Sequence, residues 1–174
     1  MKKLAIGFLL LAVPFALFSL DFYVGPTAYY ASVIQPQSVK NLSPSGMSVS
    51  DFAIGGDARL MAGLLWGGVV GLYQPGTDLL PNQLQFMTDV GLGLRILFLR
   101  AAIGVGPDFG LAFGNGATQA FRAGANLRLT GDVILGKVSF GLSWLSKIEF
   151  TQQSLSDAFS NPYGMLGVAV LFKL

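Results

Sequence analysis

The chain has 174 residues, of which 52% are apolar and only 11% are charged, whereas soluble domains carry about 25% charged residues. It contains no cysteine and no histidine, which excludes disulfides, thiolate metal sites and histidine-based catalysis. Eleven basic residues include Lys2 and Lys3, and without these two the remaining nine balance the nine acidic residues. The charge therefore gives no reason to expect a nucleic-acid partner.

Residues 1–20 have the features of a secretory signal peptide. Lys2 and Lys3 form a positive start, Leu4 to Phe18 is an apolar run, and Ser19 is a candidate small residue at the cleavage site. The alternative is an uncleaved membrane anchor, which the shortness of the run and its interruption by Pro14 make the weaker hypothesis. Residues 21–174 are then expected to form one domain.

From Leu20 onward, apolar residues occupy every second position in successive segments of about a dozen residues, the pattern of a strand with two different faces. Long polar loops are predicted at 34–48, 74–84 and 149–162, and a shorter one at 114–118. Tight turns are predicted near residues 62–63, 97–99 and 131–132, with Gly136 as the alternative for the last. This spacing predicts about eight strands joined alternately by short and long connections.

Charged residues of the predicted strands share the parity of Gly and Ser, not that of Phe, Leu and Val. They form a predicted charge network inside the fold: Asp21, Asp51, Asp57, Arg59, Asp89, Arg95, Asp108, Arg122 and Arg128, with Lys147 and Lys173 on the same parity. The strand after Gly63 is expected to place Leu64, Trp66, Val70 and Leu72 on its apolar face. An outward Arg or Lys costs roughly 2–4 kcal/mol at the middle of a bilayer, and a sheet in lipid must close on itself. The pattern predicts an all-β fold, a closed antiparallel up-and-down transmembrane β-barrel of about eight strands.

Two other folds are alternatives to the transmembrane barrel. In a soluble protein a second sheet would have to cover the apolar face. In a helical membrane protein residues 60–73 would have to span the bilayer, but this stretch is glycine-rich and shorter than the roughly twenty residues that a spanning helix needs.

Aromatic residues near the strand ends are expected to form two girdles where rings bridge hydrocarbon and headgroups. Those next to the long loops are Tyr30, Phe52, Phe86, Phe113, Phe121 and Trp144, and those next to the short turns are Phe22, Trp66 and Phe172. Pro26 and Pro107 each follow a Val-Gly pair, and proline cannot donate to a strand ladder. We therefore expect matching bulges in the first and fifth strands.

With its signal peptide, alternating segments and a last strand ending in Phe172-Lys173-Leu174, the chain resembles the small outer-membrane barrels of the OmpA, OmpX and OmpW type. The resemblance covers the whole mature chain but is architectural, and the last aromatic stands two places before the end, not at it. It implies a location in the outer membrane of a double-membraned bacterium, reached through the periplasm. It also implies a monomer with outer-membrane lipid and the barrel-assembly machinery as partners.

Two functions follow from the pattern. Inward glycines leave space for a narrow conduit or a binding site, and the OmpW-like resemblance implies small hydrophobic molecules as its occupants. The alternative is a barrel plugged by ion pairs that does not conduct and that displays loops 34–48 and 149–162 for structural, adhesion or host-interaction roles. We expect no enzymatic activity, no catalytic residues, no metal and no cofactor.

Overall fold

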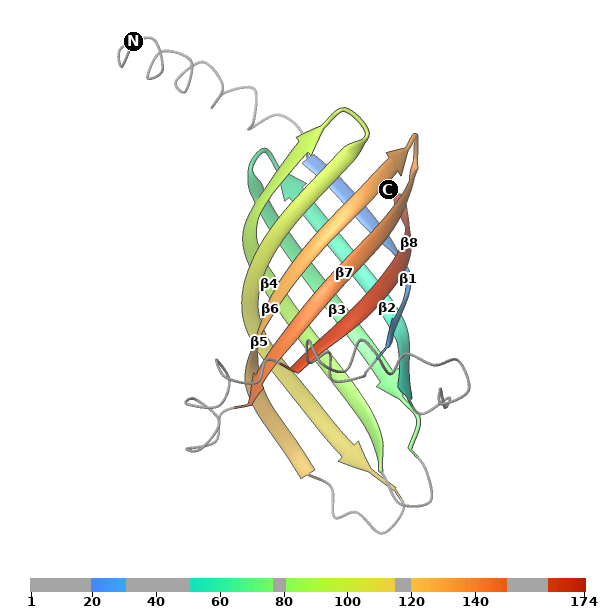
Figure 1. Cartoon of the computed structure of the whole chain (residues 1–174), viewed down its shortest axis with the longest axis vertical. Helices are drawn as coiled ribbons and strands as arrows, with labels where there is room; N and C mark the ends of the chain where they lie inside the picture. The colour runs from blue at the N-terminus through green and yellow to red at the C-terminus, as the bar shows by residue number, and fades with distance from the viewer. Residues whose placement is uncertain (1–19, 31–50, 77–80, 115–119, 150–162) are drawn as a thin grey trace, which may run out of the picture.

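The computed structural model describes residues 20–30, 51–76, 81–114, 120–149 and 163–174. They form eight antiparallel strands that close into one barrel, β1-β2-β3-β4-β5-β6-β7-β8 (Figure 1). The strands are β1 Leu20–Tyr30, β2 Phe52–Ala62, β3 Leu65–Gln74, β4 Asn82–Ile96, β5 Leu99–Phe113, β6 Ala120–Leu135, β7 Val138–Glu149 and β8 Tyr163–Lys173. The all-β closed barrel predicted from the sequence is thus confirmed. Loop 34–48, residues 1–19 of the predicted signal peptide and residues 150–162 of the loop predicted at 149–162 lie outside the described residues, whereas Leu20 and Glu149 belong to β1 and β7.

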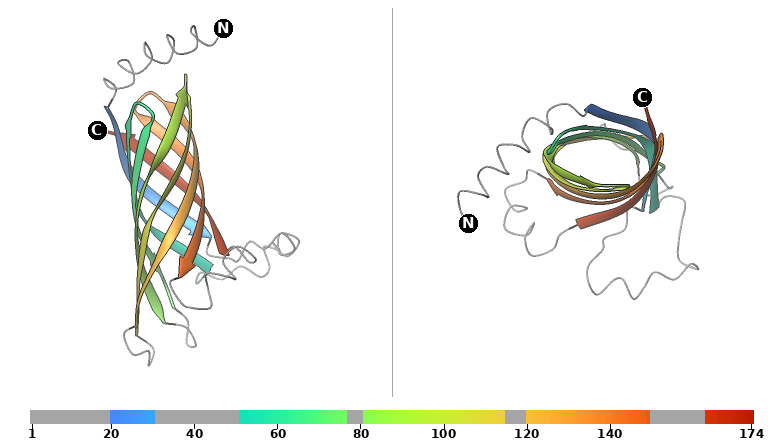
Figure 2. Two further views of the ribbon diagram at one scale, coloured as in Figure 1. Left: turned by 90° about the vertical axis from the view of Figure 1, so that its left-hand side faces the viewer. Right: turned by 90° about the horizontal axis from the view of Figure 1, so that it is seen from above.

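The register fixes how far the strands are staggered around the barrel. Paired residues can be followed once around the wall from Leu20: Ala62, Leu65, Leu92, Ile103, Leu129, Trp144, Leu166 and Tyr30. The path returns to β1 ten residues after its start, at Tyr30 instead of Leu20, so the shear number is ten. Such a stagger tilts the strands by about 35–45° from the barrel axis, and the tilt and oval outline are visible in Figure 2.

The short connections lie at one end of the barrel together with the start of β1 and the C-terminus, as expected (Figure 1). We call this the short-turn end and the opposite one the loop end. Gly63, Gly136 and Leu97 have positive φ values of 62°, 63° and 56° at the three turns. The turn after β6 is formed at Gly136, so the turn predicted near Gly131–Asp132 is wrong, and β6 runs through both residues.

The proline sites keep their register, so the expected bulges are absent. Val24 pairs with Phe172 and Thr27 with Ala169, which leaves two residues between the pairs on both strands. Around Pro107, Met87 pairs with Asp108 and Val90 with Val105, which again leaves two residues between the pairs on both strands. A Cβ on Gly25 or Gly106 would lie 2.0 or 1.7 Å from a carbonyl oxygen of the neighbouring strand. The missing glycine side chain thus permits a close approach of the two backbones at each interruption of the ladder, and no residue is inserted.

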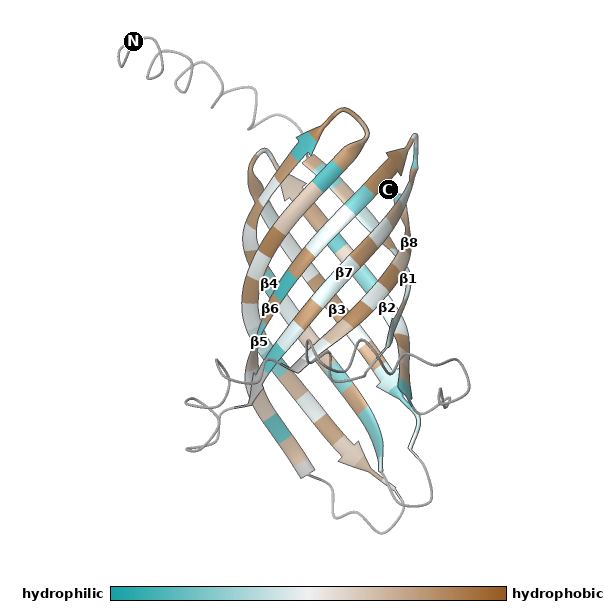
Figure 3. Cartoon of the chain, in the orientation of Figure 1, coloured by the Kyte–Doolittle hydropathy of each residue, from teal (hydrophilic) through white to brown (hydrophobic). Residues whose placement is uncertain are grey.

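Hydropathy alternates along the strands, as Figure 3 shows. Among the strand residues whose side chains are described, every charged one has the inward parity, and none has the outward parity. Large apolar residues are exposed on the outside of every strand, for example Val90 at 70% and Val168 at 58%. β3 is the exception to the predicted phase: Trp66, Val70 and Leu72 are buried, whereas Leu65, Val69 and Tyr73 are exposed.

Candidate functional site in the barrel interior

Six charged residues meet in the middle of the barrel, and we call them the central ionic cluster: Asp57, Arg59, Asp89, Arg100, Arg128 and Asp132. Each is at most 3% exposed. They come from β2, β4, β5 and β6, and every one lies on a strand parity that turns it inward.

The cluster is held by ion pairs that cross the interior. Arg59 donates from Nε and Nη2 to Asp57 Oδ2 at 2.9 and 2.7 Å, and from Nη1 to Asp132 on the distant strand β6. Arg100 Nε donates to Asp132 Oδ2 at 2.6 Å. Arg128 donates to the same Asp57 oxygen that Arg59 uses, and its Nη1 lies 3.4 Å from Asp89 Oδ2.

The three guanidinium groups therefore face three carboxylates, and the cluster is electrically balanced. This balance matters because a charge taken out of water costs several kcal/mol unless a close partner compensates it. Two rings add to the compensation: the Tyr23 ring lies 4.6 Å from the Arg100 guanidinium carbon, and the Trp66 ring 5.6 Å from that of Arg128. Cations over aromatic faces are attracted by the ring quadrupole.

Inward glycines make room for large side chains from other strands. A Cβ on Gly104 would lie 2.4 Å from the Trp66 ring. The same is true of Gly167 and the Tyr29 ring, at 2.4 Å, and a Cβ on Gly141 would lie 2.9 Å from Arg59 Nη1. The space predicted from these glycines exists, but Trp66, Tyr29 and Arg59 fill it.

Apolar side chains pack on both sides of the central ionic cluster. Toward the loop end lie buried Tyr29, Ala53, Val70, Leu72, Met87, Leu145 and Met165. Toward the short-turn end lie Tyr23, Ile134, Ala169 and Leu171. The middle of the barrel is thus a packed core with charges at its centre, as in other eight-stranded barrels whose bore is just filled by side chains.

Each end of the interior has its own polar group of residues. At the short-turn end Asp21 accepts hydrogen bonds from Arg95 Nη1, at 2.6 Å, and from Lys173 Nζ. The side chains of Arg95 and Lys173 are 37% and 36% exposed. This group therefore lies at the mouth of the barrel, in contact with solvent.

At the loop end, Lys147 Nζ on β7 donates across the bore to Gln85 Oε1 on β4. Gln85 Nε2 in turn lies 3.4 Å from Gln83 Oε1. A cavity of about 40 Å³ lies beside this bridge, lined among others by Asp108 and Arg122, and it has room for only about three water molecules.

The predicted charge network is thus divided among three places. Asp57, Arg59, Asp89 and Arg128 meet at the centre, Asp21 and Arg95 at the short-turn mouth, and Asp108 and Arg122 beside the loop-end cavity. Asp51 precedes β2 and is half-buried.

Sequence reasoning missed Arg100 and Asp132, which complete the central ionic cluster. Both have the inward parity of their strands, so strand parity was the available signal. The turns predicted at 97–99 and 131–132 had placed these two residues at strand ends.

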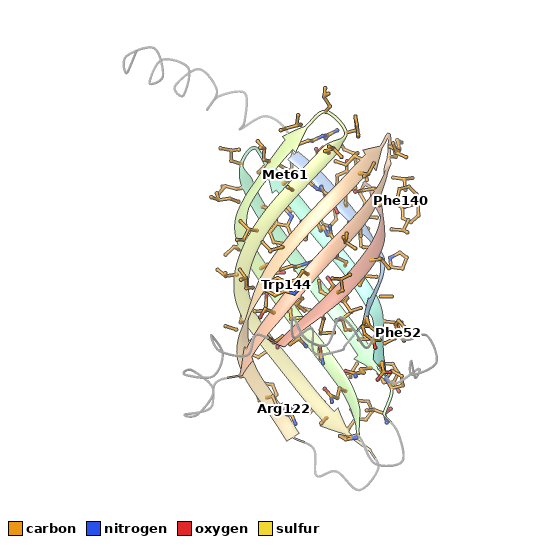
Figure 4. The ribbon with its side chains drawn as sticks, viewed as in Figure 1. Phe52, Met61, Arg122, Phe140 and Trp144 are labelled. Atoms are coloured by element: carbon orange, nitrogen blue, oxygen red, sulfur yellow. The ribbon has the colours of Figure 1, made fainter. Side chains whose placement is uncertain are left out.

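Most residues of the predicted aromatic girdles lie on the outside. Phe22, Phe52, Phe86, Phe121 and Phe172 are between 36% and 68% exposed, and Tyr30, Phe113 and Trp144 are half-exposed. Phe52 and Trp144 are labelled in Figure 4. Trp66 is the correction: at 2% exposure it points into the barrel, because Gly68 and Gly104 leave room for its ring there.

No family model matches the chain. No curated protein matches it either. No helix within the described ranges has the length and apolar character needed to cross a membrane. In the same part of the chain, no three acidic side chains are grouped so that they could hold a metal ion.

Proposed function

We propose that this chain is an integral β-barrel of a bacterial outer membrane that does not conduct, and that it acts through the segments connecting its strands at the loop end. The observation that carries the proposal is the distribution of side chains in the wall. Charged residues of the strands face inward and are paired there, whereas exposed Leu, Val, Ile and Phe residues cover the outside. Water cannot solvate such an outer surface favourably, and hydrocarbon can.

The dimensions support a bilayer as the surrounding phase. The shorter strands have 10 to 12 residues, and at about 3.3 Å per residue and a tilt of 35–45° an 11-residue strand spans roughly 25–30 Å. The apolar band of outer-membrane barrels is about 25 Å tall. The start of β1 and the end of β8 lie at the short-turn end, which agrees with the layout of such barrels, in which short turns face the periplasm.

The filled interior favours the non-conducting alternative over the conduit. Arg59, Arg100 and Arg128 are among the largest fully buried side chains, and the Lys147–Gln85 bridge crosses the bore nearer the loop end. An ion or small molecule would have to break these pairs in order to pass. The proposal includes no catalytic step.

The test combines membrane association with conductance. After expression with its first twenty residues, the protein should stay in the outer-membrane fraction through a carbonate wash and migrate on gels at an apparent mass that changes on heating. Purified and reconstituted into planar bilayers, it should give flat current traces at high salt. Release by carbonate would overturn the membrane proposal, and stable single-channel steps would restore the conduit.

The role of the connecting segments is tested by replacing 34–48 and 149–162 with short turns. We expect the variant barrel to fold and insert like the wild type. It should lose any adherence to surfaces or cells that bacteria producing the wild-type protein show. Equal adherence of both strains would remove the loop-display role and leave a structural one.

A further inference from the structure

Three neighbouring strands extend beyond the rest of the barrel at the loop end. β4, β5 and β6 have 15, 15 and 16 residues, and Figure 1 shows their loop ends projecting past those of the other strands. β5 and β6 continue about four residues past the loop ends of the shorter strands, which at 3.3 Å each and with the same tilt amounts to roughly 10 Å along the axis. β4 continues less far, because residues 93–96 of its extra length lie beyond its pairs with β3 at the short-turn end. We call residues 82–85, 109–113 and 120–123 the extension.

The extension keeps the two different faces of the barrel wall. Its outer face carries Leu84, Phe109, Leu111 and Phe121, which are 46%, 40%, 36% and 68% exposed. The rings of Phe109 and Phe121 stack with centroids 6.1 Å apart. The inner face carries Gln83, Gly110, Ala112 and Arg122, and Figure 4 labels Arg122 on the projecting part of β6.

The apolar outer face ends nearer to the short-turn end on β3 than on β5 and β6. At the loop end of β3 the outward residue is Tyr73, whose hydroxyl donates to Asn82 Oδ1 at 2.9 Å. Tyr73 is the last outward residue of β3, because Gln74 has the inward parity. On β5 and β6 the outward positions remain apolar up to Leu111 and Phe121. The apolar outer surface is therefore about 10 Å taller over β5 and β6 than over β3.

We propose that lipid hydrocarbon covers the outer face of the extension, so that the barrel axis is tilted and the β4–β6 side crosses a longer path through the bilayer. The inference rests on the proposed membrane location. Lipid is the occupant that fits, because over β5 and β6 the face continues the outer apolar wall through Val105, Leu127 and Leu129. Among the described residues of the extension, Asn82 at the end of β4 is the one polar residue with the outward parity, which is too little to mark the rim of a protein interface. A wall of unequal apolar height in a bilayer of fixed thickness is accommodated by tilting or by local thickening of the lipid.

A second copy of the chain does not fit the edge of this face. The β6 pairs with β7 begin at Gly124, so the β6 edge from Ala120 to Ala123 has no β7 partner within the described residues. Antiparallel pairing of two such edges requires a two-fold axis perpendicular to the sheet. That axis would lie in the membrane plane and would turn one barrel upside down, which two copies inserted in the same direction cannot adopt.

The absence of native cysteine allows the inference to be tested with single spin labels in liposomes. Phe121→Cys and Leu111→Cys report on the outer face of the extension, Val90→Cys on the middle of the outer wall, and Gln83→Cys on the inner face. We expect the labels at 121 and 111 to collide with dissolved oxygen and to be shielded from a water-soluble nickel complex by at least fivefold relative to the label at 83. The label at 90 should behave in the same way as those at 111 and 121.

The possible results distinguish the proposed lipid contact of the extension from the proposed membrane location of the barrel. Nickel access at 111 and 121 with shielding at 90 means that the extension stands in water, which overturns the inference and leaves the membrane location intact. Low access to both oxygen and nickel at 111 and 121 means that protein covers the face, which also overturns it. Nickel access at 90 removes the membrane location itself. Heat-dependent gel mobility of each labelled variant shows that the barrel has formed.

Discussion

At the scale of single residues, the interior depends on one carboxylate oxygen. Asp57 Oδ2 accepts hydrogen bonds from both Arg59 and Arg128, and all three side chains are fully buried. Removing one partner of a buried ion pair leaves an uncompensated charge, which costs far more than the pair itself contributes. The central ionic cluster therefore behaves as a unit.

Asp57→Asn keeps the shape of the side chain and removes its charge. We expect it to lower the free energy of unfolding by about 3–5 kcal/mol, measured by urea titration of the protein folded in lipid vesicles. Asp21→Asn is the matched control, since the partners of Asp21 are more than a third exposed and such pairs contribute about 1 kcal/mol or less. Equal losses in the two variants would contradict the distinction between centre and mouth.

Alanine substitutions of two glycines in the barrel wall provide a second test at the scale of single residues. A Cβ on Gly91 would lie 1.9 Å from the Ile103 carbonyl oxygen, whereas one on Gly71 would meet no atom within 4 Å. We expect Gly91→Ala to reduce the yield of folded, heat-modifiable protein severely, because the clash is with backbone. Gly71→Ala should fold like the wild type or be more stable by about 0.5–1 kcal/mol. A normal yield for Gly91→Ala would show that the two strands can separate there.

At the scale of strands and turns, the sequence predicted the number of strands, their order, the end at which the turns lie, and the facing of seven strands. β3 was assigned the wrong phase because it carries no charge: both of its parities are apolar or glycine, as in Leu64-Leu65-Trp66-Gly67. The facing of β3 is decided by the residues around it, since the Trp66 ring needs the space over Gly68 and Gly104. Asp132 was missed because the turn was predicted at 131–132, within a run that continues to alternate to Leu135. Arg100 directly follows the turn predicted at 97–99 and was therefore not assigned to a strand face.

The turn between β4 and β5 contains a strained residue. Leu97 has a φ of 56° and is 82% exposed, and a side chain in this left-handed region costs about 1–2 kcal/mol. We expect Leu97→Gly to stabilise the barrel by about 1 kcal/mol, measured by the same urea titration. Phe98→Gly, at the next position of the turn, should not stabilise it. A loss of stability in Leu97→Gly would mean that contacts of the leucine outweigh the backbone strain.

At the scale of the whole molecule, paired charges and apolar side chains together fill the inside of the barrel, and large apolar side chains cover its outside. An outward cation therefore tests the surroundings of the wall. Val90 is 70% exposed in the middle of β4, and Ile96 is 60% exposed beside the turn. In the proposed membrane setting, the energetic cost of a charge depends on its depth.

We expect Val90→Arg to lower the free energy of unfolding in vesicles by about 2–4 kcal/mol, and Ile96→Arg by about 0–1 kcal/mol. The measurement is the equilibrium unfolding of both variants in the same lipid. Similar small effects at both positions would mean that water reaches the middle of the outer wall, and they would contradict the membrane location.

The contact between β1 and β8 has a consequence for the order of the chain. Both ends of the folded chain lie at the short-turn end, where the Leu174 amide donates to the Phe22 carbonyl at 3.0 Å. The β1–β8 seam is closed by non-covalent contacts alone, among them the Asp21–Lys173 ion pair, while every other neighbouring pair of strands is also joined covalently. A circular permutant that links residue 174 to residue 20 and opens the chain at another hairpin would therefore have the same cylinder with a different first strand. The starting strand is a property of how the polypeptide is made, not of the architecture that it adopts.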